Sequence, residues 1–282
     1  MIKVMFWNID KKIGFENTIC DILKKEDIDI LLLAEAGNID DSEIEKNSSL
    51  KRKASPYATD QIKLTPRFYS NDLGFSLEHY HTNPNTKRMV FAYLDFPKKD
   101  PILFCGVHFR SKLMRNTETQ VAEAALYNQY INTIEDKFKR TIVLGDFNIN
   151  PFELGMISPI GFNATLTKVV AKSGQRDFMN NMFDYYYNPM WNFIGDINYQ
   201  SGQLKLPGGY YFKSNDSVTQ TYWNLLDNLI IRPSLIDEID LASITLLEES
   251  KPHVLVNKIA DEYQIDSVNY SDHLPLIFKI KK

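Results

Sequence analysis

Eight polar side chains lie at the ends of apolar runs of this sequence or interrupt them, and they are of the types that bind metal ions and phosphate groups. In chain order they are Asn8, Glu35, His108, Asp146, Asn148, Asp227, Asp272 and His273. Because no thiolate accompanies their oxygen donors, the set favours a hard cation, Mg²⁺ or Mn²⁺, over Zn²⁺. The sequence lacks a Gly-x-Ser-x-Gly elbow, a Walker loop and a dinucleotide fingerprint, so it does not support a serine hydrolase or those nucleotide-binding folds.

The most compact of these groups is the segment 141–148, Thr-Ile-Val-Leu-Gly-Asp-Phe-Asn. Its β-branched start predicts a buried strand, and Gly145 allows a close or unusual backbone path where that strand ends. Asp146 and Asn148 would then emerge from the core on a rigid scaffold, which is a common place for polar function. A structural turn after a strand has the same composition, so this segment alone leaves both interpretations open.

Two more of the polar residues end predicted strands near the N-terminus. Residues 2–7 predict a strand that ends at Asn8, and the nearly all-apolar run 28–34 predicts a doubly buried strand that ends at Glu35. Between them, the spacing of apolar residues predicts a helix over about 14–26. This strand–helix–strand unit would place Asn8 and Glu35 at the carboxyl ends of two core strands, where α/β sheets gather ligands. Taken singly, each could also be a loop residue.

The middle of the chain predicts the elements that carry the next groups. After a polar excursion over 37–61, strands are predicted over 67–69, 74–79, 88–96 and 101–107, and the last of them ends at His108. A long helix over about 116–138 then leads back to the strand before Asp146. Its predicted buried face consists of Val121, Ala125, Leu126, Tyr130 and Ile134.

Three cations follow His108 within a few residues, namely Arg110, Lys112 and Arg115. A guanidinium group pairs bidentately with phosphate oxygens, so this cluster is a candidate phosphate contact. A solvated turn with scattered charge is the alternative. The later aromatic-rich region, within 151–220, could stack a nucleic-acid base, although aromatic side chains in a β-rich protein more often serve packing.

Asp227 is the only acid in the strand predicted over 223–231. A carboxylate inside an apolar strand is costly unless it is paired, so Asp227 calls for a specific partner. Asp272 and His273 precede the last predicted strand, and as neighbours in extended chain they point to opposite sides. We therefore expect Asp227 to hydrogen-bond His273, as the acid of a catalytic triad does, and Asp272 to be free to face a metal.

The bulk composition sets wide limits on function. The 282 residues are 44% hydrophobic, which is ample for a large core, and the formal net charge of −4 argues against an indiscriminate DNA coat without excluding a nuclease. Cys20 and Cys105 lie in apolar stretches, which is typical of a reducing compartment. The N-terminal apolar run is too short for a signal sequence and no run approaches a membrane span, so we expect a soluble cytoplasmic protein without stable membrane insertion.

Five motifs in order carry a resemblance over nearly the whole chain. They are Trp-Asn-Ile at 7–9, Leu-Ala-Glu at 33–35, Val-His-Phe-Arg-Ser-Lys at 107–112, Gly-Asp-Phe-Asn at 145–148 and Ser-Asp-His-Leu-Pro at 271–275. In this order the sequence resembles the endonuclease/exonuclease/phosphatase family, which has the deoxyribonuclease-I-like fold. The resemblance implies an α/β protein, a four-layer α/β/β/α sandwich with two mixed β-sheets, formed by residues 1–282 as a single catalytic domain. It also implies Mg²⁺-dependent phosphoester hydrolysis.

The resemblance also implies roles for the metal-binding and phosphate-binding residues. Glu35 would ligate the metal with Asn8 beside it, and Asp272 would complete the acidic cluster, at a second metal position if two ions bind. Arg110, Lys112 and Arg115 would contact the substrate phosphate.

The catalytic residues implied by the same motifs are His108, Asp146, Asn148, Asp227 and His273. Asp146 would position or deprotonate the attacking water, and Asn148 would hold the phosphate or the nucleophile. His273 would contact the scissile phosphate as a donor or acid, oriented by Asp227. His108 would be a second histidine that faces the phosphate.

The leading functional hypothesis is therefore a metal-dependent nuclease that acts on the phosphodiester bonds of DNA or RNA. It depends on basic residues expected in loops near the site, which are Arg67, Lys87, Arg88, Arg110, Lys112 and Arg115. A phosphatase or phosphodiesterase acting on a phospholipid, inositol phosphate or nucleotide is the alternative within hydrolases. A catalytically silent binding module with the same fold is the alternative outside them. The sequence leaves the oligomeric state open.

Overall fold

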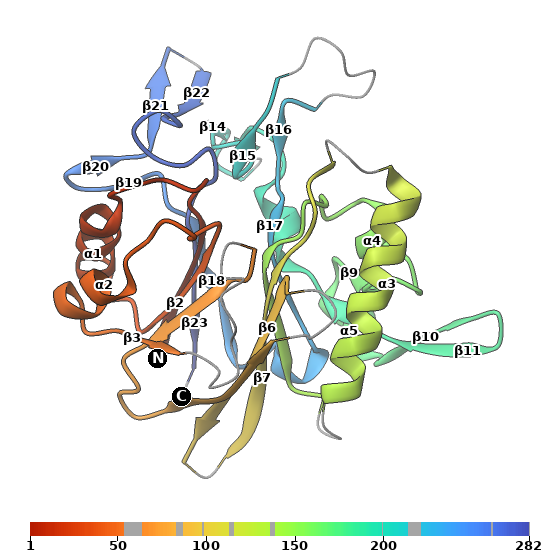
Figure 1. Cartoon of the computed structure of the whole chain (residues 1–282). Helices are drawn as coiled ribbons and strands as arrows, with labels where there is room; N and C mark the ends of the chain where they lie inside the picture. The colour runs from red at the N-terminus through yellow and green to blue at the C-terminus, as the bar shows by residue number, and fades with distance from the viewer. Residues whose placement is uncertain are drawn as a thin grey trace.

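Two mixed β-sheets lie face to face in the middle of the protein, and helices cover their outer faces (Figure 1). The computed structural model describes residues 1–53, 64–82, 87–97, 99–112, 116–135, 139–198, 200–213, 221–260 and 262–281. From left to right in Figure 1 the layers are helix, sheet, sheet and helix. The predicted four-layer α/β/β/α sandwich with two mixed sheets is confirmed.

The first sheet has six strands in the order β18-β23-β1-β2-β4-β3. Their bounds are β1 (Ile2–Asn8), β2 (Ile30–Ala34), β3 (Lys51–Lys53), β4 (Arg67–Ser70), β18 (Ile239–Leu246) and β23 (Leu276–Ile280). β1 and β2 are parallel and are joined through helix α1 (Glu16–Lys25), so the predicted strand–helix–strand unit is confirmed. All five residues of β2 are buried, as a strand covered on both faces requires.

The second sheet has seven strands in the order β5-β6-β7-β8-β17-β12-β9. Their bounds are β5 (Ser76–Thr82), β6 (Met89–Phe96), β7 (Lys99–His108), β8 (Thr141–Asp146), β9 (Ala164–Thr165), β12 (Tyr186–Tyr187) and β17 (Asp227–Ile231). β7 and β8 are parallel, and the connection between them contains α3 (Thr117–Ile134). β17 then pairs with β8 in the antiparallel sense.

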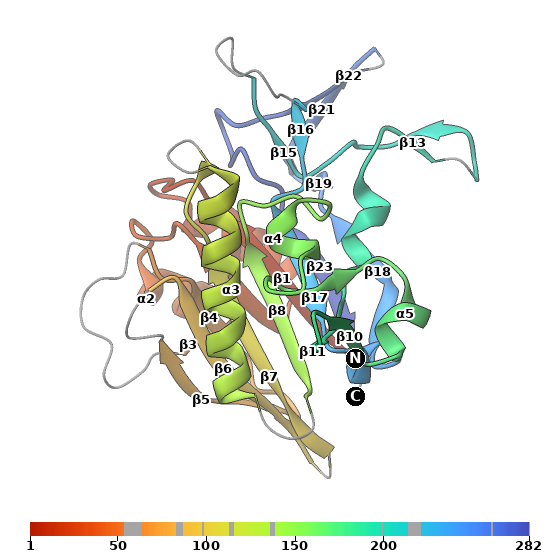
Figure 2. The same cartoon turned by 90° about the vertical axis from the view of Figure 1, so that its right-hand side faces the viewer.

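The remaining elements are short. Helix α2 (Asp41–Asn47) lies beside α1, while α4 (Leu154–Ile157) and α5 (Lys168–Lys172) lie on the α3 side of the sandwich, as Figure 2 shows from the side. The two-stranded hairpins are β10 (Gln175–Phe178) with β11 (Asn181–Asp184), β13 (Ile197–Asn198) with β14 (Gln203–Leu204), β15 (Tyr210–Tyr211) with β16 (Trp223–Asn224), β19 (Glu249–Ser250) with β20 (His253–Val254), and β21 (Val256–Ile259) with β22 (Glu262–Ile265). Single 3₁₀ turns span Pro189–Phe193 and Pro233–Leu235. Within the described ranges, no helix combines the length and apolar character needed to cross a membrane.

The main core lies where the two sheets meet. Phe68 of β4 contacts Phe104 of β7 edge-on at 5.5 Å between ring centroids, so the rings join the sheets directly. Gly106 lets them approach closely, because a Cβ atom there would lie 3.0 Å from the Leu32 side chain of the opposite sheet and 2.7 Å from Val90. A second core cluster fills the space between the seven-stranded sheet and α3.

The buried face of α3 differs from the prediction, because Leu126 is 64% exposed. The residues that the helix buries are Gln120, Glu123, Ala124, Tyr127 and Ile131. Two of these side chains are polar and are buried because each has a hydrogen-bond partner, Gln120 in the segment after β8 and Glu123 on α3 itself. Gln120 donates to the backbone carbonyl of Asn148 at 2.8 Å, and Glu123 accepts a hydrogen bond from Tyr127 at 3.0 Å. The spacing of apolar residues alone cannot predict that polar side chains such as these are buried.

Two other expectations were wrong. The strand predicted over 223–231 is two strands, β16 and β17, which pair with different partners. Strand pairing is interrupted between them, where the Leu225 N–H donates to the Asn150 side chain at 2.8 Å. Arg67 does not lie in a loop near the site. It is 4% exposed in β4, and its guanidinium donates to Asp41 at 2.8 Å and to the Ile39 carbonyl at 3.1 Å.

Candidate active site

Three of the predicted site residues lie in one row across the seven-stranded sheet. In the strand register, His108 of β7 is opposite Asp146 of β8, and Asp146 is opposite Asp227 of β17. Gly145 is required beside this row, because its φ is +152° and a Cβ atom would lie 1.9 Å from the Val107 carbonyl oxygen. Strand pairing therefore brings together residues that are far apart in the sequence.

Asp146 is the most firmly held carboxylate of the site. Its Oδ1 accepts a hydrogen bond from the Asn148 N–H at 2.8 Å, and its Oδ2 accepts from the Asn148 side-chain amide at 2.9 Å and from the Asn8 amide at 3.0 Å. All three residues are at most 8% exposed. Because Asn8 ends β1 and Asp146 ends β8, this contact links the two sheets at the edge where the predicted site residues lie.

His273 forms the predicted hydrogen bond with Asp227, with 2.8 Å between Nδ1 and Oδ2. Its backbone N–H donates to Ser271 at 3.1 Å, and its carbonyl accepts from Trp7 at 2.9 Å, so both sides of the residue are anchored. The Tyr210 ring packs against the imidazole with 4.5 Å between ring centroids. With Nδ1 engaged by Asp227, Nε2 is the ring nitrogen available to a ligand.

The charges around His273 favour its protonated form. Burial alone would lower its pKa, but the carboxylates of Asp227, Asp146 and Asp272 outweigh burial and raise the pKa of His273 to about 10. Burial raises the pKa of the Asp227 carboxyl to about 6, against the opposing pull of His273. Burial and the nearby carboxylates raise the pKa of Tyr210 to about 12, so that phenol is neutral at physiological pH.

Glu35 lies between two nitrogen groups, Lys11 Nζ at 2.8 Å and His108 Nε2 at 3.3 Å. It has a left-handed backbone with φ of 53°, which turns the carboxylate off the end of β2 into this position. Burial would raise its pKa, but His108 and Lys11 outweigh burial and lower the pKa of Glu35 to about 2. His108 Nε2 also lies 3.9 Å from Asp146 Oδ2, so this histidine stands between the two carboxylates.

Asp272 has the least support of the predicted acids. Its carboxylate is only partly buried, and its contact with the neighbouring Ser271 hydroxyl is long, at 3.5 Å, because that hydroxyl donates to the Asn8 carbonyl at 2.6 Å. Burial raises the pKa of Asp272 above its ordinary value. It therefore has lone pairs to offer to a metal ion or a ligand.

The donor set fits a hard divalent cation. Asp146, Asp227 and His273 present ligand-type atoms within 4.8 Å of one another. Within the described residues, Asp227 Oδ1 is buried and accepts no hydrogen bond. This unpaired oxygen shows that the negative charge of the centre is not fully compensated. Glu35, Asn8 and Asp272 add further oxygen donors, and an oxygen-rich set without thiolates matches a hard divalent cation.

The predicted phosphate-binding cations are engaged with carboxylates. Arg110 lies 3.3 Å from Glu123, and Lys112 pairs with Glu153. Arg115 lies outside the described residues. Of the other basic residues considered, Arg88 donates from its guanidinium to the carbonyls of His108 at 3.1 Å and Phe109 at 3.3 Å, so it fixes the end of β7.

Three residues were not predicted at the site from the sequence: Lys11, Gln120 and Tyr210. Lys11 follows the Asn8 strand end by three positions, so its proximity to the site could have been inferred from the sequence. Gln120 and Tyr210 reach the site through long-range packing of α3 and β15, for which the local sequence has no signal.

The chain is similar in structure to several solved proteins, although its sequence matches no family model and no curated protein. A mannosyl-6-phosphatase of Bacteroides thetaiotaomicron superposes with a TM-score of 0.61 and 12% identity, covering 100% of both chains. An endonuclease/exonuclease/phosphatase family protein of the same organism gives 0.59 and 12%, covering 98% of this chain and 96% of that one. An AP endonuclease from Archaeoglobus fulgidus gives 0.54 and 13%, covering 100% of both chains.

These similarities establish the class of fold. The chain shares its fold with the AP endonuclease and with the endonuclease/exonuclease/phosphatase family protein, so the deoxyribonuclease-I-like fold implied by its motifs is confirmed. The named similar proteins include both a nuclease and a phosphatase, so the fold by itself does not choose a substrate.

Proposed function

We propose that this protein is a divalent-metal-dependent phosphoester hydrolase. The observation that carries the proposal is the convergence of Asp146 with the Asp227–His273 pair, whose ligand-type atoms lie within 4.8 Å of one another. A fixed carboxylate beside a buried, hydrogen-bonded histidine supplies a group that positions water and a group that donates to phosphate. The fold supports this reaction class by analogy only.

Glu35, Asn8 and Asp272 are the residues that would hold the metal ion, Mg²⁺ or Mn²⁺. Such an ion, when bound, offsets the negative charge that develops on the phosphate group. Lys11 holds one oxygen of Glu35, but its side chain is 66% exposed and the pair is close to solvent. Releasing such a pair costs little, so Lys11 does not bar a cation from Glu35.

Asp146 would position the attacking water and accept its proton. Asn148 supports this role rather than contacting phosphate through its amide, because its Nδ2 already donates to Asp146 at 2.9 Å and to the Phe109 carbonyl at 3.1 Å. Its Oδ1 remains an acceptor for the water. The rigid hold on Asp146 means that little reorganisation is needed when the substrate binds.

His273 would donate from Nε2 to a phosphate oxygen or to the leaving group. Asp227 keeps the ring oriented and favours its charged form, which is the form that can donate from both nitrogens. His108, between Glu35 and Asp146, would face the phosphate from the other side.

A nucleic acid is the first candidate substrate, so the protein would be a nuclease that acts on DNA or RNA. One similar structure is an AP endonuclease. Arg110 and Lys112 would contact the phosphate backbone after releasing Glu123 and Glu153, with Arg115 as a third contact. Affinity that depends steeply on salt concentration would accompany such contacts.

A small phosphoester is the second candidate, and the ion pairs of the same two cations favour it. A small ester needs only the catalytic centre, whereas a polymer needs unpaired cations along its path. The similar structure of a mannosyl-6-phosphatase is compatible with this candidate.

Turnover of a substrate panel tests the proposal. The panel consists of plasmid DNA, single-stranded DNA, RNA, bis-p-nitrophenyl phosphate and p-nitrophenyl phosphate, each with Mg²⁺ and with a chelator. Cleavage of a polymer supports the nuclease, and turnover of the small esters alone supports the second candidate. Absence of metal-dependent turnover on every substrate would contradict the hydrolase proposal and favour a binding module.

A further inference from the structure

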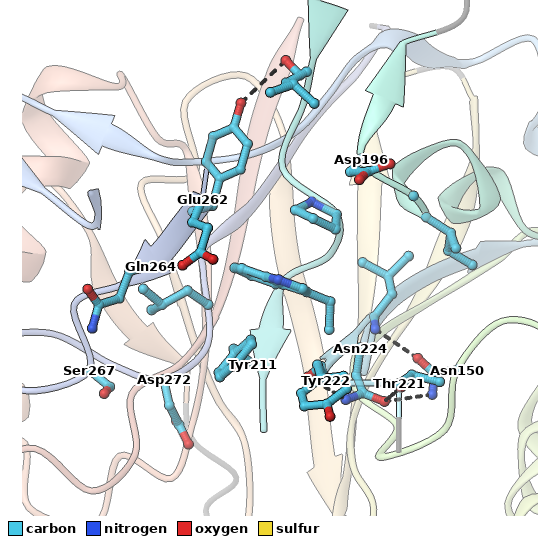
Figure 3. Close-up of a pocket in the computed structure, with 18 of the residues that line it drawn as sticks. Asn150, Asp196, Tyr211, Thr221, Tyr222, Asn224, Glu262, Gln264, Ser267 and Asp272 are labelled. Carbon is cyan, nitrogen blue, oxygen red and sulfur yellow. Dashed lines mark hydrogen bonds between the residues drawn. The ribbon is translucent and has the colours of Figure 1, made fainter. Parts of the chain in front are cut away.

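A cavity of about 870 Å³ adjoins the catalytic centre on the side of Asp272 (Figure 3). Its walls come from the β13–β14, β15–β16 and β21–β22 hairpins, which lie together at one end of the sandwich (Figures 1 and 2). The volume falls within the range of sites that enclose small molecules, about 300–1,000 Å³.

Asp272 joins the cavity to the site, because it lines the cavity and its carboxylate is one of the proposed metal ligands. Asp272, which lines it, precedes His273, and Tyr211, which lines it, follows the Tyr210 ring that packs on His273. Asn150 lines the opposite wall, two residues after Asn148. A substrate whose phosphate bound beside Asp272 would therefore carry its attached group toward this cavity.

Aromatic side chains form one part of the lining. Tyr211 packs edge-on against Trp223 with 5.2 Å between ring centroids and lies 6.5 Å from the Tyr222 ring. Tyr211 is 42% exposed and Tyr222 is 48% exposed, so a large part of each side chain remains accessible to a ligand. They offer flat, partly apolar faces to a ring-shaped ligand.

Unused hydrogen-bond acceptors form the other part. Figure 3 shows Glu262, Gln264 and Asp272 along one side of the cavity and Asp196 farther up. In the part of the chain that the structure describes, the side chains of Glu262, Gln264 and Asp196 make no hydrogen bond or ion pair, and Asp272 makes only its contact with Ser271. Carboxylates without partners accept hydrogen bonds from a ligand's donors.

The same lining lacks positive charge. None of its described residues is a lysine or an arginine, while three are carboxylates. Two ammonium groups lie beside the lining: Lys258 Nζ is 5.5 Å from the centroid of the Tyr263 ring, and Lys205 Nζ donates to the Ile194 carbonyl at 3.2 Å. The carboxylates do not suit a polyanionic strand and the neighbouring ammonium groups do not favour a cationic ligand. An uncharged ligand that is rich in donors and has a face that packs on aromatic rings suits the cavity best.

We infer that this cavity binds the leaving group of a small phosphoester and that this group is an uncharged, hydroxyl-rich ring, of which a monosaccharide is the simplest form. The inference rests on the proposed function for the position of the phosphate. Hydroxyl pairs suit the carboxylates of Glu262 and Asp196, and the C–H face of a sugar ring suits Tyr211. The cavity therefore selects the substrate, whereas the strand ends perform the chemistry.

Saturation-transfer NMR with methyl hexopyranosides tests binding without relying on hydrolysis, since these probes carry no phosphate. Glu262→Gln and Tyr211→Ala are compared with wild type, and Glu249→Gln, an exposed glutamate of another hairpin, is the matched control. Thermal melting checks that each variant is folded. In parallel, kcat/KM is measured for hexose 6-phosphates and for methyl phosphate, which has no ring.

We expect saturation transfer to the sugar in wild type and Glu249→Gln and its loss in Tyr211→Ala. Glu262→Gln should lower kcat/KM for a hexose phosphate by about 10-fold or more and leave methyl phosphate within about twofold. Failure of hydrolysis with sugar binding intact would contradict the proposed function alone. Absence of sugar binding in wild type, or sugar binding that persists in Tyr211→Ala, would overturn the cavity inference.

Discussion

The site at the strand ends and the cavity beside it are built in opposite ways. Asp146 and His273 are 2% and 6% exposed, and hydrogen bonds from several separate elements fix each of them. In the cavity, Tyr211 and Tyr222 are 42% and 48% exposed, and the carboxylate of Glu262 accepts no hydrogen bond within the described ranges. One region is fixed before a ligand arrives, and the other presents open groups to it.

This difference assigns separate tasks to the two regions. Phosphoester chemistry requires donors and acceptors held within fractions of an ångström, which buried strand ends provide. Selection of the attached group can rest on loops, whose sequence can vary without disturbing the sheets. We therefore expect substitutions at the strand ends to abolish turnover of every substrate and substitutions in the cavity to change which substrate is preferred.

The largest effect should come from the groups that handle water and phosphate. We expect Asp146→Asn and His273→Ala each to lower kcat by about 100-fold or more on every substrate, because each removes a proton-transferring or phosphate-donating group. His253→Ala is the matched control: this histidine pairs with Asp21 at 3.3 Å, away from the site, and should retain activity within about twofold. Equal activity of wild type and His273→Ala would contradict the assignment of the chemistry to the strand ends.

The partner of His273 should set the pH dependence. In wild type the pKa of His273 is raised to about 10, so its charged form persists through neutral pH and is lost only as pH rises through about 10. Asp227→Asn removes the main carboxylate partner, and the alkaline limb of the kcat/KM profile should move to lower pH by about one to three units. An unmoved alkaline limb would show that His273 is not the group that titrates there.

Gln120 should have an intermediate effect because it acts through Asn148. We expect Gln120→Ala to destabilise the protein by about 1–2 kcal/mol, since it removes a buried 2.8 Å hydrogen bond to the Asn148 carbonyl. It should also lower kcat more than it changes KM. Leu126→Ala, on the exposed face of the same helix, should change the unfolding free energy by less than about 0.5 kcal/mol. Denaturant unfolding and kinetics measure both, and equal destabilisation would contradict the observed face of α3.

The smallest effect concerns Lys11, which competes with a cation for Glu35. Lys11→Met should tighten Mn²⁺ binding by about twofold to fivefold, because an exposed ion pair of this kind contributes little. Isothermal titration measures the affinity directly, and Lys12→Met, which alters the neighbouring charge, is the control. Weaker metal binding in Lys11→Met would mean that the lysine supports the site instead of competing for it.

The strand-end site could be predicted from the sequence because its residues sit at fixed offsets from long apolar runs. Asn8, His108 and Asp146 each end a strand whose burial the pattern predicts, and Glu35 directly follows one. The Asp227–His273 hydrogen bond was predicted from the cost of a lone buried carboxylate. Their chemical roles remain predictions. The two sheets were implied by the resemblance of the motifs, and the structure agrees with it.

The cavity could not be predicted in the same way. The strands around the cavity are two to four residues long, which is too short for a periodic pattern of apolar residues. The interruption between β16 and β17 depends on a hydrogen bond to Asn150, which is distant in the sequence. The ion pairs of Arg110 and Lys112 could not be predicted from the sequence either, because tertiary packing brings Glu123 and Glu153 to them.

The Mg²⁺ dependence of phosphoester turnover in wild type and Glu35→Gln tests the central claim most directly. Turnover of p-nitrophenyl phosphate or its diester should saturate with Mg²⁺, disappear with a chelator and return when Mg²⁺ is restored. Glu35→Gln should require at least about tenfold more Mg²⁺, because it removes a charged ligand. Turnover that is unaffected by both the chelator and the substitution, or no turnover of any phosphoester, would contradict metal-dependent phosphoester hydrolysis at this site.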